Sequence, residues 1–136
     1  MYKLIKANKE NIPLLEEFKI NTFYNLPNNE LENIKKYVHK TIPQYLSKYN
    51  LIVVADEIVG SLLYYPYLEG VLLDELYIIE KYRNQKIGTN IINDICLNNV
   101  VYLWVYHNNT KAINLYKRLG FSIIETTINR YLMKKS

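Results

Sequence analysis

The stretch that decides the fold is Asp74–Thr89, DELYIIEKYRNQKIGT. Its first half is rich in β-branched and aromatic residues, which predicts a strand that ends near Ile79. A polar turn follows, and apolar residues at helical spacing predict a helix from about Lys86. This order brings unpaired backbone N–H groups together with the positive end of a helix dipole. The segment therefore predicts a binding place for a phosphate-bearing ligand.

The polar residues of this turn suit the same ligand. Gly88 has no Cβ, so a ligand can approach its backbone closely, and Arg83, Gln85 and Lys86 add charge and donors. The alternative is a solvated loop before a helix whose packing needs a small residue. The phosphate-loop patterns G-x-x-x-x-G-K-[ST] and G-x-G-x-x-G are both absent from the sequence.

Outward from this segment, hydrophobic periodicity predicts an α/β domain with one mixed sheet. Strands are expected at Tyr2–Ala7, Leu51–Ala55, Ile58–Tyr65, Val71–Ile79, Val100–Tyr106, Phe121–Thr126 and Arg130–Lys134. Helices are expected at Ile12–Ile20, Glu30–His39, Lys86–Leu97 and Thr110–Leu119. The element order is β-α-α-β-β-β-α-β-α-β-β, and residues 1–136 are expected to form a single domain. Breaks are expected at Pro27 with Asn28–Asn29 and at Pro43, with a short helical piece at Gln44–Lys48.

Composition narrows the function classes. The chain has 136 residues, 49% of them apolar, so it is globular and not disordered. Its net charge of +4 suits an anionic ligand but is too scattered to indicate nucleic acid binding. The longest apolar run is too short to span a bilayer. We expect a cytoplasmic protein that binds neither nucleic acid nor membrane.

The sequence also argues against metal and thiol chemistry. Cys96 is the one cysteine, so no internal disulfide can form, and its place on an apolar helix stripe favours a core position over a nucleophile. His39 and His107 lie far apart and form no metal-ligand motif. No metal site is expected. Trp104, in a strand expected to be buried on both faces, is interpreted as core.

Two motifs resemble those of the GNAT superfamily of N-acetyltransferases. Tyr82–Thr89, YRNQKIGT, is similar to the family's acyl-CoA pyrophosphate loop, R/Q-x-x-G-x-G/A. Asn109–Phe121, NTKAINLYKRLGF, is similar to the family signature N-x-x-A-x-x-L-Y-x-x-x-G-F. The motifs occur in the family's order and spacing, and the resemblance covers essentially the whole chain. One residue departs from it: Lys86 stands at the first loop glycine, so either this position needs no positive φ or the loop is distorted.

The resemblance implies a GNAT-like acyl-CoA N-acyltransferase fold with a splayed central sheet, and acetyl-CoA as co-substrate. The pantetheine arm would pair with one strand end as an extra strand, and the pyrophosphate would bind the backbone N–H groups of Gln85–Thr89. A V-shaped cleft for the thioester would open between that strand and the one at Val100–Tyr106. The residues implied in coenzyme binding are Leu76, Tyr77, Ile78, Arg83, Gln85, Lys86, Ile87, Gly88, Thr89, Asn109, Asn114 and Lys117.

The resemblance also implies catalytic roles. Tyr116 matches the family tyrosine that donates a proton to the departing thiolate, although a tyrosine on an apolar helix face is often simply core. Leu73–Ile78, LDELYI, is similar to the L-E-D-I-Y-V run of spermidine/spermine acetyltransferases. There the acid at the position of Asp74 acts as base and its neighbour, here Glu75, helps hold a cationic acceptor. Strand alternation places Asp74 and Glu75 on opposite faces, and both could instead be surface acids.

The expected function is acetyl transfer from acetyl-CoA to a primary amine by direct attack in a ternary complex. The paired acids Asp74 and Glu75 favour a small cationic amine as the acceptor, and a peptide N-terminus or a lysine side chain is the alternative. A non-catalytic acyl-CoA-binding module is the alternative, which Lys86 favours. The residues Tyr24, Tyr37, Tyr45 and Tyr49 are interpreted as lining an acceptor pocket or a homodimer interface.

Overall fold

The computed structural model describes the backbone of residues 1–23 and 28–136. It divides into two compact units, each built from two stretches of chain. The first unit contains Met1–Leu63 and Glu75–Ile87, and the second contains Tyr64–Asp74 and Gly88–Ser136. That the whole chain acts as a single domain stays a prediction. In the described part of the chain, no helix combines the length and the apolar character needed to cross a bilayer.

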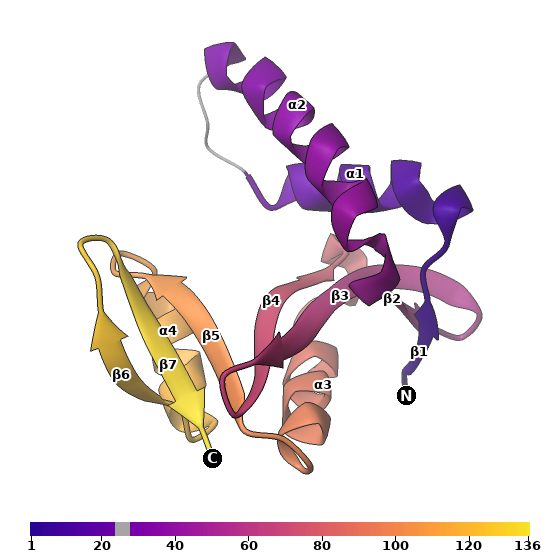
Figure 1. Ribbon diagram of the computed structural model, residues 1–136. Helices are drawn as coiled ribbons and strands as arrows, with labels where there is room; N and C mark the ends of the chain where they lie inside the picture. The colour runs from indigo at the N-terminus through magenta and orange to yellow at the C-terminus, as the bar shows by residue number, and fades with distance from the viewer. Residues whose placement is uncertain (24–27) are drawn as a thin grey trace. The chain divides into compact units, whose positions relative to one another are not determined.

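The element order predicted from the sequence is confirmed (Figure 1). The strands are β1 (Lys3–Lys6), β2 (Tyr49–Val54), β3 (Glu57–Tyr67), β4 (Gly70–Ile78), β5 (Val101–Tyr106), β6 (Ser122–Thr126) and β7 (Arg130–Lys135). The helices are α1 (Ile12–Asn21), α2 (Asn28–Tyr45), α3 (Ile87–Cys96) and α4 (Thr110–Arg118), with short 3-10 turns η1 (Lys9–Asn11), η2 (Leu46–Lys48) and η3 (Glu80–Tyr82). Hydrogen bonds link the strands in the order β1-β2-β3-β4-β5-β7-β6. The pair β4–β5 is parallel, while β1–β2, β2–β3, β5–β7 and β6–β7 are antiparallel, so the sheet is mixed as expected.

The core of the first unit forms where α1 and α2 pack with the strands. Apolar residues three or four apart supply each helix with a buried stripe. The fully or almost fully buried members are Leu15, Phe18, Val38, Ile42, Leu51 and Ile52. Asn8 begins the helical region with a capping box, in which its side chain accepts from Glu10 N–H and its own N–H donates to Asn11 Oδ1 at 2.8 Å.

The predicted boundaries of the second helix were wrong. Instead of Glu30–His39, α2 runs through Pro43 to Tyr45, and the expected break at Asn28–Asn29 is where the helix begins. The buried pair Val38 and Ile42 lies one turn apart, and this burial outweighs the single hydrogen bond that a proline near a helix end removes. Pro27 lies outside the described residues.

Strand β3 also runs further than predicted, through Pro66 to Tyr67. Its ladder with β2 ends at Leu63, so Pro66 has no ladder hydrogen bond to lose on that side. The ladder shifts register between Ile52 and Val53, where Val59 is the extra residue of a bulge.

The core of the second unit gathers around β5. Val101, Tyr102, Leu103 and Val105 are buried, and only Tyr106, at the strand's end, is largely exposed. This confirms the prediction of a strand buried on both faces for those four residues. Trp104 was predicted to be core and is only half-buried, with the Arg130 guanidinium 4.5 Å from its ring centroid.

The parallel ladder between β4 and β5 is short. It consists of Val71 with Val101 and Leu72 with Tyr102, whereas β5 pairs with β7 over six residues. Strand β4 continues to Ile78 after this ladder has ended. The splay of the central sheet expected from the resemblance stays a prediction.

Gly60 in β3 fits closely against the end of β4. A Cβ at Gly60 would lie 1.9 Å from the backbone oxygen of Tyr77, which no real Cβ can do. The absence of a side chain at this position therefore allows β4 to approach β3 where the polar residues of the candidate site begin.

We expect Gly60→Ala to lower the free energy of unfolding by about 2–4 kcal/mol, because the backbone of β4 must move. Gly120→Ala is the matched comparison: its backbone is left-handed (φ +101°), but a Cβ would meet only the flexible Lys135 side chain at 3.2 Å. Its expected loss is about 1 kcal/mol. Urea denaturation of both variants measures this, and a Gly60→Ala protein as stable as the parent would contradict the close approach.

Candidate active site

The end of β4 has one backbone edge turned away from β3. The Ile79 N–H donates to Val59 O at 2.8 Å, so by strand alternation the backbone groups of Leu76 and Ile78 point to the opposite edge. There the Ile78 carbonyl accepts a hydrogen bond from Arg83 Nε at 2.7 Å. The Arg83 guanidinium also lies 5.5 Å from the centroid of the Tyr77 ring. These contacts hold Arg83 at the entrance of the following loop.

The loop after η3 has two residues in the left-handed conformation, Asn84 (φ 63°) and Lys86 (φ 64°). This resolves the alternatives for Lys86: the position does need a positive φ, and here a lysine adopts it. For a residue other than glycine or asparagine the conformation costs about 1 kcal/mol. Tyr82 anchors the loop, because its hydroxyl donates to Glu57 Oε1 at 2.8 Å, and this hydrogen bond raises the pKa of Tyr82.

The backbone N–H groups of the loop donate to no acceptor outside α3 among the described residues. Apart from the internal hydrogen bonds of α3, no hydrogen bond in the described part of the chain is donated by the N–H of residues 85–89. The Gln85 side chain is different, since its amide donates to Lys81 O at 3.2 Å and so stabilises the loop itself. A row of unpaired N–H groups at the start of a helix is suited to an anion.

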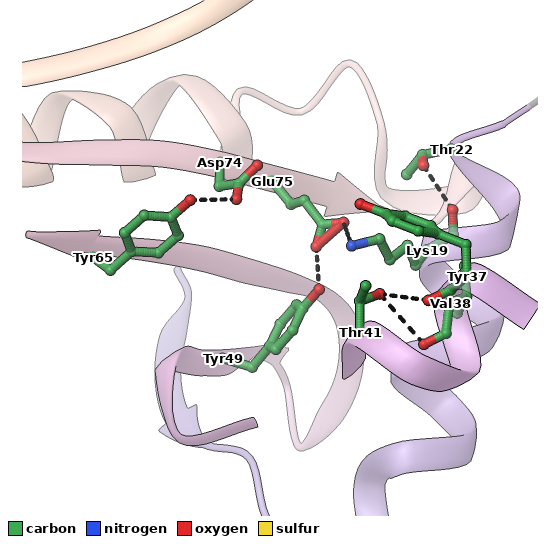
Figure 2. Close-up of polar contacts among 9 residues, drawn as sticks. All are labelled: Lys19, Thr22, Tyr37, Val38, Thr41, Tyr49, Tyr65, Asp74 and Glu75. Carbon is green, nitrogen blue, oxygen red and sulfur yellow. Dashed lines mark hydrogen bonds and ion pairs between the residues drawn. The ribbon is translucent and has the colours of Figure 1, made fainter. Parts of the chain in front are cut away.

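The two adjacent acids of β4 have different surroundings (Figure 2). Glu75 is half-buried, and its Oε1 lies 3.2 Å from Lys19 Nζ while its Oε2 accepts a hydrogen bond from the Tyr49 hydroxyl. Asp74 is exposed and accepts a hydrogen bond from the Tyr65 hydroxyl at 2.7 Å. Glu75 therefore has a partner on each oxygen, whereas Asp74 is open to solvent.

The sequence reasoning missed Lys19, and it singled out Tyr49 without its contact to Glu75. Lys19 follows the buried Leu15 by four residues, so it lies on the inward stripe of α1, and that spacing was the available signal. Tyr49 is only 1% exposed. Of the other tyrosines singled out from the sequence, Tyr37 is exposed with Lys19 Nζ 5.3 Å from its ring centroid, Tyr45 is on the surface of α2, and Tyr24 lies outside the described residues.

In the second unit, α4 carries the other candidate residues. Asn109 is its N-cap, with Oδ1 accepting from Ala112 N–H at 3.3 Å, so the side-chain amide group remains available as a donor. Tyr116 packs against Phe121, with ring centroids 5.8 Å apart, and burial raises the pKa of its phenol. Asn114 and Lys117 lie exposed along the same helix.

The structure thus groups the candidates in two sets. The first unit brings together Leu76, Tyr77, Ile78, Arg83, Gln85, Lys86 and Ile87 with Glu75, and the second carries Asp74, Gly88, Thr89, Asn109, Asn114, Tyr116 and Lys117. Among the described residues, no group of three His, Cys, Asp or Glu side chains is placed to hold a metal ion. Cys96 is half-buried on α3, where burial raises the pKa of its thiol and so disfavours the thiolate.

The fold was compared with those of known proteins. A family model described as an acetyltransferase (GNAT) domain matches residues 48–123. The crystal structure of PaiA N-acetyltransferase from Thermoplasma acidophilum in complex with coenzyme A has a TM-score of 0.76 at 17% identity, covering 100% of this chain and 99% of that one. A GNAT-family acetyltransferase from Listeria monocytogenes has a TM-score of 0.75 at 12% identity, with 98% and 94% covered.

A third solved structure combines coenzyme and acceptor chemistry. Naa50 from Arabidopsis thaliana, in complex with the bisubstrate analogue CoA-Ac-MVNAL, has a TM-score of 0.68 at 25% identity, covering 99% of this chain and 98% of that one. No curated protein matches the sequence. The family model spans more than half of the chain, and the fold, the loop before α3 and the α4 signature agree with it. This chain belongs to the GNAT acetyltransferase family.

Proposed function

We propose that this chain transfers the acetyl group of acetyl-CoA to a primary amine, by direct attack while both substrates are bound. The observation that carries the proposal is the row of N–H groups at residues 85–89, which donate to no protein acceptor outside α3 in the described part of the chain. Arg83 is held beside this row by its hydrogen bond to Ile78 O. Coenzyme A is a bound ligand in the structure from Thermoplasma acidophilum, which supports the same ligand here.

The loop is proposed to hold the pyrophosphate, and the edge of Leu76 and Ile78 to pair with the pantetheine arm as an added strand would. Gly88 and Thr89 at the start of α3 contribute N–H donors, and the Lys86 ammonium lies on the same loop. In the second unit, Asn109 is proposed to donate to the pantetheine from the amide group that its capping bond leaves available. Asn114 and Lys117, both exposed, are proposed to contact the outer part of the coenzyme.

The reaction needs two proton movements. The acceptor ammonium must lose a proton before its nitrogen can attack the thioester carbonyl; the C–N bond then forms, the C–S bond breaks and the leaving thiolate takes up a proton. Asp74 is the proposed base, directly or through water, because it is exposed while both oxygens of Glu75 have partners. Tyr116 is the proposed acid, because it stands at the tyrosine of the α4 signature; burial raises its pKa, so the phenol carries its proton at neutral pH.

Coenzyme binding tests the loop. Calorimetric titration of the wild-type chain with acetyl-CoA is expected to show binding in the micromolar range, and no detectable binding at millimolar ligand would contradict the proposal.

Lys86→Ala removes the ammonium but keeps the left-handed strain, whereas Lys86→Gly removes both. We expect Lys86→Gly to be about 0.5–1 kcal/mol more stable than Lys86→Ala in urea denaturation, with equal coenzyme affinity. Equal stability of the two variants would contradict the strain.

Tyr116→Phe is expected to lower kcat roughly a hundredfold while leaving coenzyme affinity unchanged, because only the proton donor is lost. Since burial raises the pKa of Tyr116 above its ordinary value near 10, wild-type activity is not expected to fall with phenol ionisation below about pH 10. Tyr67→Phe is the control, a tyrosine of β3 whose ring packs on Tyr102. A Tyr116→Phe enzyme with wild-type kcat would remove this residue from the mechanism.

Steady-state kinetics of two single variants distinguish the roles of Asp74 and Glu75. Asp74→Asn is expected to lower kcat/KM roughly a hundredfold, because the carboxylate proposed to accept the ammonium proton is lost. Glu75→Gln is the comparison and should lower kcat/KM much less, because Asp74 is retained. Unchanged kcat/KM in Asp74→Asn would exclude Asp74 as the base.

An assay of free thiol release with a panel of amines and peptides separates the enzyme from a non-catalytic module. Release with any acceptor supports the transferase. Coenzyme binding without turnover across the whole panel would support an acyl-CoA-binding module instead.

A further inference from the structure

Lys19 lies in a position unusual for a lysine. Its side chain is only 12% exposed, on the inward stripe of α1, and its ammonium lies 3.2 Å from Glu75 Oε1 and 5.3 Å from the centroid of the Tyr37 ring (Figure 2). A carboxylate and an aromatic face are the two surroundings that stabilise a desolvated cation in a protein. Glu75 and Tyr37 therefore form a cation-binding site, and the ammonium of Lys19 occupies it.

The carboxylate of Glu75 is fully engaged in the same cluster. It is 17% exposed, and its second oxygen accepts from the hydroxyl of Tyr49, which is itself almost completely buried. A half-buried carboxylate without a counter-charge would be unstable, so it must have a cation nearby. Lys19 is that cation, and the cluster has no net charge.

This cluster lies toward the acceptor end of the coenzyme, an inference that rests on the proposed function. With the pyrophosphate at residues 85–89 and the pantetheine arm along Leu76–Ile78, the thioester end of the coenzyme points back along β4 toward Glu75. Glu75 and Tyr77 share one face of β4, and both contact α1. Glu75 pairs with Lys19, and the Tyr77 ring packs against Phe18 with ring centroids 5.1 Å apart. Glu75 is thus the first acid on the α1 face beyond the proposed arm.

We propose that Lys19 determines acceptor specificity: by occupying the carboxylate of Glu75, it prevents Glu75 from acting as the counter-charge for a second ammonium on the acceptor. The acceptor class is then an amine whose only positive charge is the reacting one, such as a peptide α-amine or a monoamine, and not a diamine or polyamine. The expectation from the strand motif that Glu75 holds a cationic acceptor is replaced by an internal pairing with α1.

The test compares butylamine with 1,4-diaminobutane, which differ by one ammonium group. In Lys19→Met, Glu75 loses its internal cation, and we expect the ratio of kcat/KM for diamine over monoamine to rise roughly tenfold over wild type, the value of one charge-assisted contact. Lys19→Arg, which keeps the charge, and Lys35→Met, which removes a lysine with a 51% exposed side chain from α2, should keep the wild-type ratio. The double variant Lys19→Met/Glu75→Gln should also show the wild-type ratio, because it has no carboxylate at position 75.

A second readout does not depend on turnover. Millimolar 1,4-diaminobutane is expected to raise the melting temperature of Lys19→Met but not that of wild type or of the double variant, and butylamine should raise none of them. Lys19→Gln replaces Lys19→Met if the methionine variant does not fold, since its amide can still donate to Glu75. If no variant acetylates any amine, the proposed function fails while the melting shift still decides the role of Lys19. An unchanged kcat/KM ratio or an absent shift would overturn the role of Lys19.

Discussion

The short parallel ladder between β4 and β5 is the constraint on which the rest of the site depends. It ends after Leu72, although β4 runs on to Ile78. Beyond that point, the backbone groups of Leu76 and Ile78 face the edge turned away from β3. An unpaired strand edge can accept an added strand. Within the first unit, this edge lies next in the chain to the loop before α3 and to the Arg83 side chain that donates to Ile78 O.

Backbone strain and backbone proximity hold that edge in place. Gly60 lets β4 approach β3, since any side chain there would meet the carbonyl of Tyr77. In the loop between η3 and α3, Lys86 adopts a conformation in which glycine would be unstrained. A residue that costs stability without contributing to the core suggests a functional constraint, here the direction of the N–H groups at the start of α3.

Much of this organisation could be predicted from the sequence. The alternation of strands and helices could be predicted because β5 and α4 have strong, uninterrupted patterns. The loop motif predicts an anion-binding place at the start of α3. The end of α2 could not be predicted from the sequence. The burial of Val38 and Ile42 depends on tertiary packing, and this packing outweighs the tendency of Pro43 to end the helix. The conformation of Lys86 was left open for a related reason: a sequence shows which residue stands at a position but not the φ that the loop demands there.

The pairing of Glu75 with Lys19 lay beyond sequence reasoning as well. The two residues are far apart in the chain, and only the packing of α1 brings them together. The consequence for function is substantial, because an acid that the strand motif assigned to the acceptor is engaged by the protein's own lysine. Asp74, its neighbour on the other face, remains exposed and suited to proton transfer.

The most direct test of the account is the amide spectrum of the ¹⁵N-labelled chain during titration with acetyl-CoA. The account predicts the largest shift changes at the N–H groups of residues 85–89, with Leu76 next, because these groups gain hydrogen bonds from the ligand. Binding that leaves these amides unchanged and perturbs others would contradict it.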